Sequence, residues 1–236
     1  MKRRLLLSAT LAFISTVSFA QQRALNFDGT DDYVTSAYPG ITGSNARTIE
    51  AMIRTTANCN PNTGGIQNTI VDWGDMNTGQ RFTFNLLWAN SVRIEIGGSG
   101  ISGSTPVNDG QWHHIAVTYS GSPTTGNTKL YIDGTLEATG TLSGVNTSSL
   151  TPVTIGRRVS QNNYFDGDID EVRVWNAALS ATDIQSRASD EMCTPPATCV
   201  LYYKFNQGTV GGNNAGQTTA FDAIANNNGT LSNFSM

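Results

Sequence analysis

The chain has 236 residues, of which 24 are glycine and 14% are charged, with 18 acidic against 14 basic side chains. A formal net charge of −4 leaves no basic stripe for a nucleic acid or an anionic membrane surface, so the composition argues against both partners. The many glycines and the low charge favour an all-β protein, and the length fits one large β domain as well as two small ones.

The N-terminus has the pattern of a secretory signal peptide. A basic stretch at residues 2–4 precedes an apolar run over residues 5–19, and Ala20 ends a cleavage site of small residues. We therefore expect residues 1–20 to be removed and the mature chain to be secreted or held at the cell surface. No later segment approaches eighteen uninterrupted apolar residues, so we expect no membrane-spanning helix.

Short alternating segments fill residues 24–175, and turn residues separate them about every eight to twelve positions, which is typical of an antiparallel sandwich. The clearest predicted strands are Thr48–Arg54, Thr69–Trp73, Arg81–Trp88, Val92–Ile96, Trp112–Tyr119, Lys129–Gly134 and Val153–Gly156. One short helix is predicted after the last strand of this region, with Ser180 as N-cap and Asp183 three residues later.

The segment over residues 166–175 reads as a strand that carries several carboxylates. Period-two alternation places Asp168 and Asp170 on the same face as Val172 and Val174. A carboxylate on an apolar face needs an arginine, a run of backbone N–H groups or a cation, because burying it bare would cost several kcal/mol.

These segments resemble the bacterial laminin-G-like (LamG) domains of the concanavalin A-like lectin/glucanase superfamily. The matching pieces are L-N-F-D-G-T-D-D-Y-V from Leu25, T-I-E-A-M-I-R from Thr48, W-H-H-I-A-V-T-Y from Trp112, K-L-Y-I-D-G from Lys129, T-I-G from Thr154 and F-D-G-D-I-D-E-V-R-V-W-N-A-A-L-S from Phe165. The resemblance covers about residues 24–188. It implies an all-β, antiparallel two-sheet jelly-roll sandwich over residues 21–190, with one short helix and with the first and last strands side by side.

The resemblance also implies calcium, which members of the superfamily often carry near the junction of the first and last strands. The opening turn contains Asp28, Asp31 and Asp32, and the closing strand adds Asp168 and Asp170. Carboxylate oxygens are the ligands that calcium prefers. The expected calcium ligands are Asp28, Asp31, Asp168 and Asp170. The alternative is that the opening aspartates form Asx-turns and that Asp170 pairs with a neighbouring arginine, Arg157 or Arg158.

Ligand contacts are expected from loops. The candidates are the long polar loop Asn58–Asn68, an aromatic side chain among amides and one tyrosine elsewhere, the last two being Asn162, Asn163, Tyr164 and Tyr38. All four tryptophans fall in predicted strands and are expected in the core. No enzyme activity is expected: the alternate residues of the closing strand have the spacing of a glycosidase pair, but all are aspartates and no E-x-D-x-x-E segment occurs.

Three cysteines and a change of composition mark the C-terminal region. Cys193 and Cys199 bracket a short loop with two prolines and are expected to form a disulfide, which leaves Cys59 free, whereas three reduced thiols are the alternative. Residues 191–236 are expected to hold one more strand and then a weakly ordered tail rich in glycine and asparagine, or the start of a truncated further module.

The sequence therefore predicts a secreted, non-catalytic binding module that recognises a glycan or another extracellular ligand and carries structural calcium. Further domains of a larger surface protein are its expected neighbours. An architectural spacer within an adhesin is the second hypothesis, and a glycoside hydrolase of the same superfamily is the third.

Overall fold

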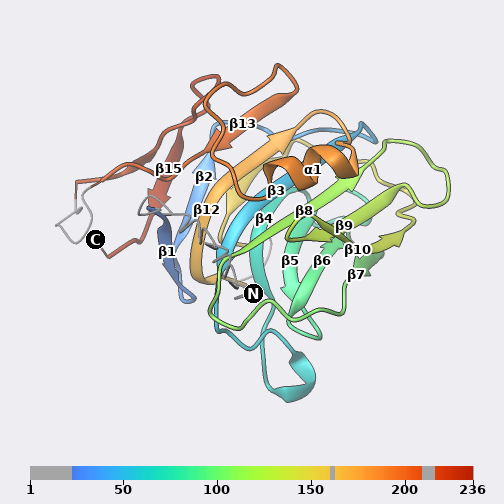
Figure 1. Cartoon of the computed structure of the whole chain (residues 1–236), viewed down its shortest axis with the longest axis horizontal. Coiled ribbons are helices and arrows are strands. Elements are labelled where there is room, and N and C mark those ends of the chain that lie inside the picture. The colour runs from blue at the N-terminus through green and yellow to red at the C-terminus, as the bar shows by residue number, and fades with distance from the viewer. Residues whose placement is uncertain (1–22, 160–162, 209–215, 236) are drawn as a thin grey trace, which may run out of the picture.

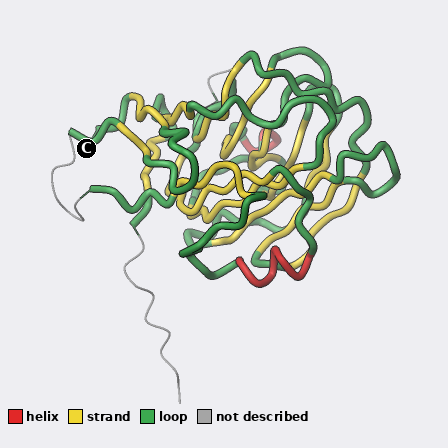
Figure 2. The backbone as a smooth tube through the Cα atoms, turned by 90° about the horizontal axis from the view of Figure 1, so that it is seen from above, coloured by secondary structure: helices red, strands yellow, loops and turns green. Residues whose placement is uncertain are grey.

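The computed structural model describes residues 23–159, 163–208 and 216–235, and within these ranges the strands form two facing antiparallel sheets (Figures 1 and 2). The first sheet has the order β10 (Thr135–Gly140), β9 (Thr128–Ile132), β8 (His113–Tyr119), β3 (Arg47–Arg54), β12 (Asp166–Trp175), β1 (Leu25–Asp28), and β13 (Cys199–Tyr203) also pairs with β12. The second has the order β14 (Thr219–Ala220), β15 (Gly229–Ser232), β2 (Tyr33–Ser36), β11 (Thr151–Ile155), β4 (Asn68–Gly74), β5 (Thr83–Leu87), β6 (Ser91–Glu95), β7 (Gly100–Ser102). The predicted two-sheet sandwich is confirmed, while the signal segment and Asn162 lie outside the described residues.

The hydrophobic core fills the space between the sheets, because alternate strand residues point inward. In β3 the buried residues include Ile49 and Ile53, and the second sheet contributes Val71, Phe84 and Ile94. All five are fully excluded from solvent. Each such side chain contributes about 1.5–3 kcal/mol relative to leaving it exposed. The sandwich is thus held together by apolar contacts that run through both sheets.

A β-bulge in β12 reverses the face assignment expected from alternation. Glu171 has φ +51°, and the pairing with β3 shifts register between Asp170 and Arg173. Ile169 therefore enters the core together with Val172 and Val174. The expectation that Asp168 and Asp170 share a face with those valines is wrong, because one extra residue in the strand switches the side that follows it.

The outer face of the first sheet is covered by helix α1 (Ala181–Arg187), which Ser180 and Asp183 cap reciprocally as predicted (Figure 1). Under this cover lies a buried ionic network in which Arg173 contacts the carboxylates of Glu171 and Glu50. Tyr202 of β13 donates its hydroxyl to Glu171, so the network ties the C-terminal strand to β12. Within the described ranges, no helix is long and apolar enough to cross a membrane.

The C-terminal region is part of the sandwich. β13 pairs with the second half of β12, and β15 pairs with β2. The expectation of a weakly ordered tail is therefore wrong for residues 216–235, which extend the second sheet. Tyr203 also donates a hydrogen bond to Ser36 Oγ at 2.8 Å, and this contact joins the two sheets at that edge.

Candidate functional site

An acidic turn connects β1 of the first sheet with β2 of the second. The carboxylates of Asp28, Asp31 and Asp32 each offer an oxygen within 4.8 Å of the others. Asp28 Oδ1 accepts the N–H of Thr30 at 2.8 Å, and Asp32 Oδ2 accepts the N–H of Asp28 at 3.0 Å. Short Asp side chains satisfy the turn backbone in this way, so the D-G-T-D-D sequence folds back on itself. The turn brings three negative charges together.

Asp166, the first residue of β12, extends the acidic turn. It is paired with Asp28, and a Cβ added at Gly29 would lie 2.8 Å from the Asp166 Cβ. Gly29 also has φ +74°, so this close approach requires glycine. Burial raises the pKa of the Asp166 carboxyl, and the nearby charge of Asp28 adds to the shift.

Asp32 is the buried member of the group, with 4% of its surface exposed. Its Oδ1 is enclosed and has no hydrogen-bond partner. Burial raises the pKa of Asp32, and the charges of Asp28 and Asp31 raise it further. Within the described part of the chain, no arginine or lysine forms an ion pair with these carboxylates. The acidic turn therefore has oxygen ligands but no protein cation to balance them.

The two other expected calcium ligands lie elsewhere on the first sheet. Asp168 accepts hydrogen bonds from Arg54 Nε at 2.8 Å and from Asn26 Nδ2 at 3.0 Å. Asp170 is opposite Met52 of β3, and its Oδ1 accepts the N–H of Glu171 at 2.8 Å. The structure brings Asp28 and Asp31 together as expected, and it places Asp32 with them in place of the closing-strand aspartates.

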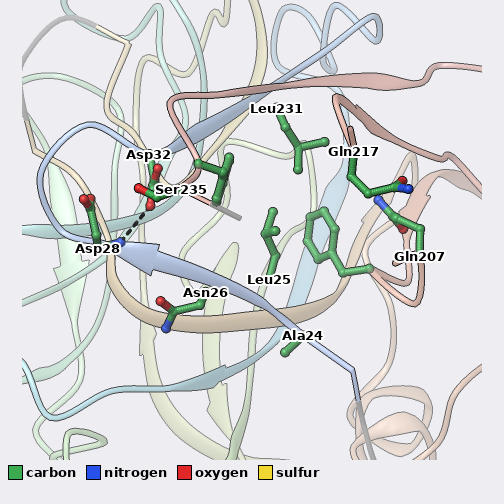
Figure 3. A pocket seen from close by; sticks show the side chains of 11 residues that line it. Ala24, Leu25, Asn26, Asp28, Asp32, Gln207, Gln217, Leu231 and Ser235 are labelled. Atoms are coloured by element: carbon green, nitrogen blue, oxygen red, sulfur yellow. Dashed lines mark hydrogen bonds between the residues drawn. The ribbon is translucent and has the colours of Figure 1, made fainter. Parts of the chain in front are cut away.

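A pocket of about 540 Å³ adjoins the acidic turn (Figure 3). It lies between β1 and the C-terminal segment, whose Asn233 side chain donates to the Asp31 carbonyl at 2.9 Å. Its lining combines carboxylates, amides and apolar side chains, which include Asp28, Asp32, Asn26, Gln207, Gln217, Leu25, Phe205, Leu231 and Phe234. Such a mixture offers hydrogen-bond donors and acceptors beside apolar surface.

Among the described residues, the loop residues proposed from the sequence as ligand contacts do not line this pocket. Tyr164 forms an isolated bridge with Arg157, and the Asn163 carbonyl accepts the N–H of Arg158 at 3.1 Å. Tyr38 follows the other end of β2, where its carbonyl accepts the N–H of Val153. The structure does not bring Tyr38 and Tyr164 together. The pocket residues at positions 205–234 were not predicted from the sequence, because their segment lacks a clear strand pattern.

All three cysteines are free thiols in the structure. The disulfide expected between Cys193 and Cys199 is not present: Cys193 is exposed in the loop, and Cys199 is buried, with its Sγ 3.6 Å from the Leu201 carbonyl. Burial raises the pKa of both Cys59 and Cys199 to about 12. The two buried thiols are therefore protonated at neutral pH.

The tryptophans divide into different environments. Trp73 and Trp175 are fully buried, as expected for core residues, and Arg54 lies over the ring of Trp112 at 5.1 Å. Trp88, in contrast, follows the end of β5 and is 46% exposed. The expectation that all four tryptophans belong to the core is wrong for Trp88 and for Trp112, which is only partly buried, lies just before β8 and belongs to none of the hydrophobic clusters of the described residues.

Several solved structures share this fold. A protein of Bacteroides ovatus described as a candidate carbohydrate-binding protein superposes with a TM-score of 0.65 and 24% identity, over 89% of this chain and 57% of that one. The sialidase module CBM40 of Ruminococcus gnavus, also solved with α2,3-sialyllactose, gives TM-scores of 0.55 and 0.54 at 14% identity, over 70% of this chain and 96% of that one. Domain 4 of the arabinanase AbnA from Geobacillus stearothermophilus, in complex with arabinotriose, gives 0.53 at 18% identity, over 70% and 76%.

Sequence comparison places the chain in a family. A rat protein, "Sushi, von Willebrand factor type A, EGF and pentraxin domain-containing protein 1", is 32% identical over 100 residues, which are 38% of this chain and 3% of that protein. The chain thus spans a small fraction of that relative and 57% of the Bacteroides ovatus protein. Residues 28–185 match Laminin_G_3, and this match includes the acidic turn, β12 and most of α1. The chain therefore belongs to the concanavalin A-like lectin/glucanase superfamily, as a Laminin_G_3 domain.

Proposed function

We propose that this protein is a non-catalytic carbohydrate-binding module that acts outside the cell and is stabilised by calcium. The observation that carries the proposal is the pocket beside the acidic turn, where Asp28 and Asp32 meet amide and aromatic side chains in one concave site. Carboxylates and amides hydrogen-bond sugar hydroxyls, while apolar rings contact the C–H faces of a sugar. Solved relatives of the same fold are described with arabinotriose and sialyllactose, which supports this ligand class.

Calcium fits the acidic turn on physical grounds. The ion takes six to eight oxygen ligands, and carboxylates are the strongest that a protein offers. Asp28, Asp31 and Asp32 would hold it, with Asp166 beside them, and it would neutralise a group of charges that lacks a protein cation. It would also give the buried Oδ1 of Asp32 a partner. The residues of the turn therefore suit a structural calcium ion that shapes one wall of the pocket.

Melting curves with and without calcium test the metal part of the proposal. At a calcium concentration about a hundredfold above the dissociation constant, the folded state should gain about 2.7 kcal/mol, or about 5–10 °C in melting temperature for a domain of this size. EDTA should reverse the gain. Asp32→Asn should abolish the response, whereas the matched variant Asp168→Asn should retain it, because Asp168 is held by Arg54 outside the turn. A melting temperature that ignores both calcium and EDTA would contradict the proposal.

The pH dependence of this response follows from the raised pKa values of Asp32 and Asp166, which burial causes. Protons compete with calcium for the same oxygens. As the pH falls, these two carboxyls take up protons earlier than ordinary aspartates, so the calcium response should fade at a higher pH than a cluster of exposed aspartates would show.

A glycan array tests the ligand part. The protein should retain particular glycans, and Gln217→Ala, which removes one amide from the pocket, should weaken retention without changing the melting temperature. A protein that takes up calcium but retains no glycan would favour the architectural spacer instead. Hydrolysis of any glycan on the array, seen as release of reducing ends, would contradict the non-catalytic reading.

A further inference from the structure

Trp88 occupies an unusual position for a large apolar residue. It begins the turn between β5 and β6 with φ +54°, a left-handed conformation that side chains of this kind rarely adopt. Nearly half of its surface is exposed. Asparagine or glycine would suit this turn better, and almost half of the tryptophan surface stays in contact with solvent.

A second exposed apolar residue lies at the same end of the second sheet. The register between β4 and β5 pairs Asn68 with Leu86, so Ile66 before β4 and Trp88 after β5 lie at the same end of this strand pair. Ile66 is 61% exposed. Beneath these residues the hairpin is fixed, because Asn90 Oδ1 accepts the N–H of Cys59 at 2.7 Å. This hydrogen bond holds the hairpin that carries Trp88 against the loop that contains Cys59.

The loop that contains Ile66 is polar, and neither this loop nor the turn that contains Trp88 carries a charge. Residues 55–71 and 82–92 contain no aspartate, glutamate, lysine, arginine or histidine. The loop between β3 and β4 protrudes from the lower end of the sandwich in Figure 1 and contains the short 3-10 helix η1 (Pro61–Thr63). Exposed Asn62 of this loop supplies an amide, whereas the amide of Asn58 forms hydrogen bonds with Thr63 inside the loop. We call the surface formed by Trp88, Ile66 and the loop of residues 58–67 the indole surface.

The chemistry of the indole surface selects its ligand. A nucleic acid, an acidic peptide or an anionic membrane would require positive charge, which these segments lack. A neutral sugar presents an apolar C–H face for an aromatic ring and hydroxyls that both donate and accept, which matches an indole beside amides. Asn68, where the loop ends, accepts the N–H of Asp166 through Oδ1 at 2.7 Å, so the indole surface and the acidic turn occupy the same end of the sandwich.

We propose that the indole surface is a second glycan-contact site, which takes neutral sugar rings by stacking on Trp88. The proposal rests on the proposed carbohydrate-binding function and adds a site separate from the pocket beside the acidic turn. A neutral polysaccharide chain is its ligand class, because this surface is open and uncharged.

Affinity electrophoresis in gels that contain arabinan, xylan, mannan or mixed-linkage β-glucan tests the site. The test variant is Trp88→Asn, since asparagine accepts positive φ and should leave the melting temperature unchanged or raised. The matched control is Leu150→Asn, which removes an apolar side chain that is 73% exposed next to β11, whose Thr151 pairs with Gly74 at the opposite end of β4. We expect Trp88→Asn to weaken retention about tenfold or more, which corresponds to about 1.4 kcal/mol, and Leu150→Asn to behave as wild type.

The outcomes separate the two proposals. Retention of wild type that survives unchanged in Trp88→Asn but falls in Gln217→Ala would overturn the indole surface and leave the pocket. If no glycan on the array and no polysaccharide retains the wild type, both proposals fail. Stacking has a direct sign in fluorescence. A retained polysaccharide should protect tryptophan fluorescence of the wild type from quenching by acrylamide, and this protection should be lost in Trp88→Asn. Loss of self-association in Trp88→Asn without any change in retention would show that the residue serves a protein contact instead.

Discussion

The Asp72 carboxylate on β4 provides a measure of what burying a charge costs in this fold. It is fully buried, and it accepts hydrogen bonds from Thr83 Oγ1 at 2.8 Å and from the N–H of Val159 at 2.9 Å. Burial nevertheless raises its pKa from 3.8 to about 6. A raised pKa means that the folded state binds the proton more tightly than the unfolded state does. The stability that Asp72 contributes is therefore fully present below pH 3.8 and is lost as the pH rises through about 6.

Asp72→Asn removes this titration and keeps the shape of the side chain. The amide oxygen can accept from Val159, and the amide nitrogen can donate to Thr83 Oγ1. With pKa values of about 6 when folded and 3.8 when unfolded, linkage predicts that wild type loses about 1.4 kcal/mol from this group between pH 5 and pH 8. The free energy of unfolding of the variant, measured relative to wild type, should therefore increase by about 1.4 kcal/mol over that range.

Urea denaturation followed by tryptophan fluorescence at pH 5 and pH 8, with EDTA present, measures this difference. In thermal melts the same change corresponds to about 3–6 °C. Asp32 and Asp166, whose pKa values burial also raises, are present in both proteins, so their contributions cancel in the comparison. If wild type and Asp72→Asn show the same pH dependence, the carboxylate does not titrate as its burial requires, and the reasoning fails.

Two further predictions concern the thiols and the C-terminal strands. Iodoacetamide should label Cys193 alone in the native protein, because Cys59 and Cys199 are buried with pKa values of about 12. Peptide mapping that finds Cys199 labelled without denaturant would contradict this. A chain that ends after residue 198 loses the Tyr202 contact to Glu171 and uncovers Arg173, and breaking a buried network of this kind costs about 3–5 kcal/mol. Calorimetry should show a melting temperature at least about 6 °C lower, and an unchanged transition would show that β13 is dispensable.

Most of the sandwich could be predicted from local sequence patterns. The segment Thr48–Arg54 alternates so regularly that its apolar side could only face a core, and it forms β3 with Ile49 and Ile53 buried. Ser180 and Asp183 are separated by the spacing of a capping box, and they cap α1 as expected. These features depend on neighbours within a few residues, which a single sequence contains in full.

The remaining errors come from interactions that are distant in sequence. Glu171, with φ +51°, lies between the part of β12 that pairs with β1 and the part that pairs with β13, and nothing in the residues 166–175 alone marks a bulge there. Asp168 lies away from the acidic turn because β1 pairs Asp28 with Asp166, which leaves Asp168 opposite Asn26. β15 is short and follows an asparagine-rich segment, and its pairing with β2 depends on a partner almost two hundred residues earlier in the chain.

Trp88 escaped the sequence reasoning for a different reason. The run from Thr83 to Trp88 alternates like one continuous strand, yet the strand ends at Leu87 and the next residue turns into the left-handed region. Turn positions of this kind usually carry glycine or asparagine, so a tryptophan at this position does not indicate a turn. The exposed position becomes visible only when the hairpin register is known.

The pairing of distant segments also determines how the chain reaches this structure. Leu25 pairs with Ile169 in the first sheet, and Ser36 pairs with Gly229 in the second, so both sheets are completed by segments that begin far apart. Closing such long loops costs entropy before the contacts repay it, and sandwiches dominated by distant pairings fold in milliseconds to seconds, where helical bundles take microseconds to milliseconds. Tyr202 of β13 contacts Glu171, so the docking of β13 onto β12 completes the burial of this ionic network.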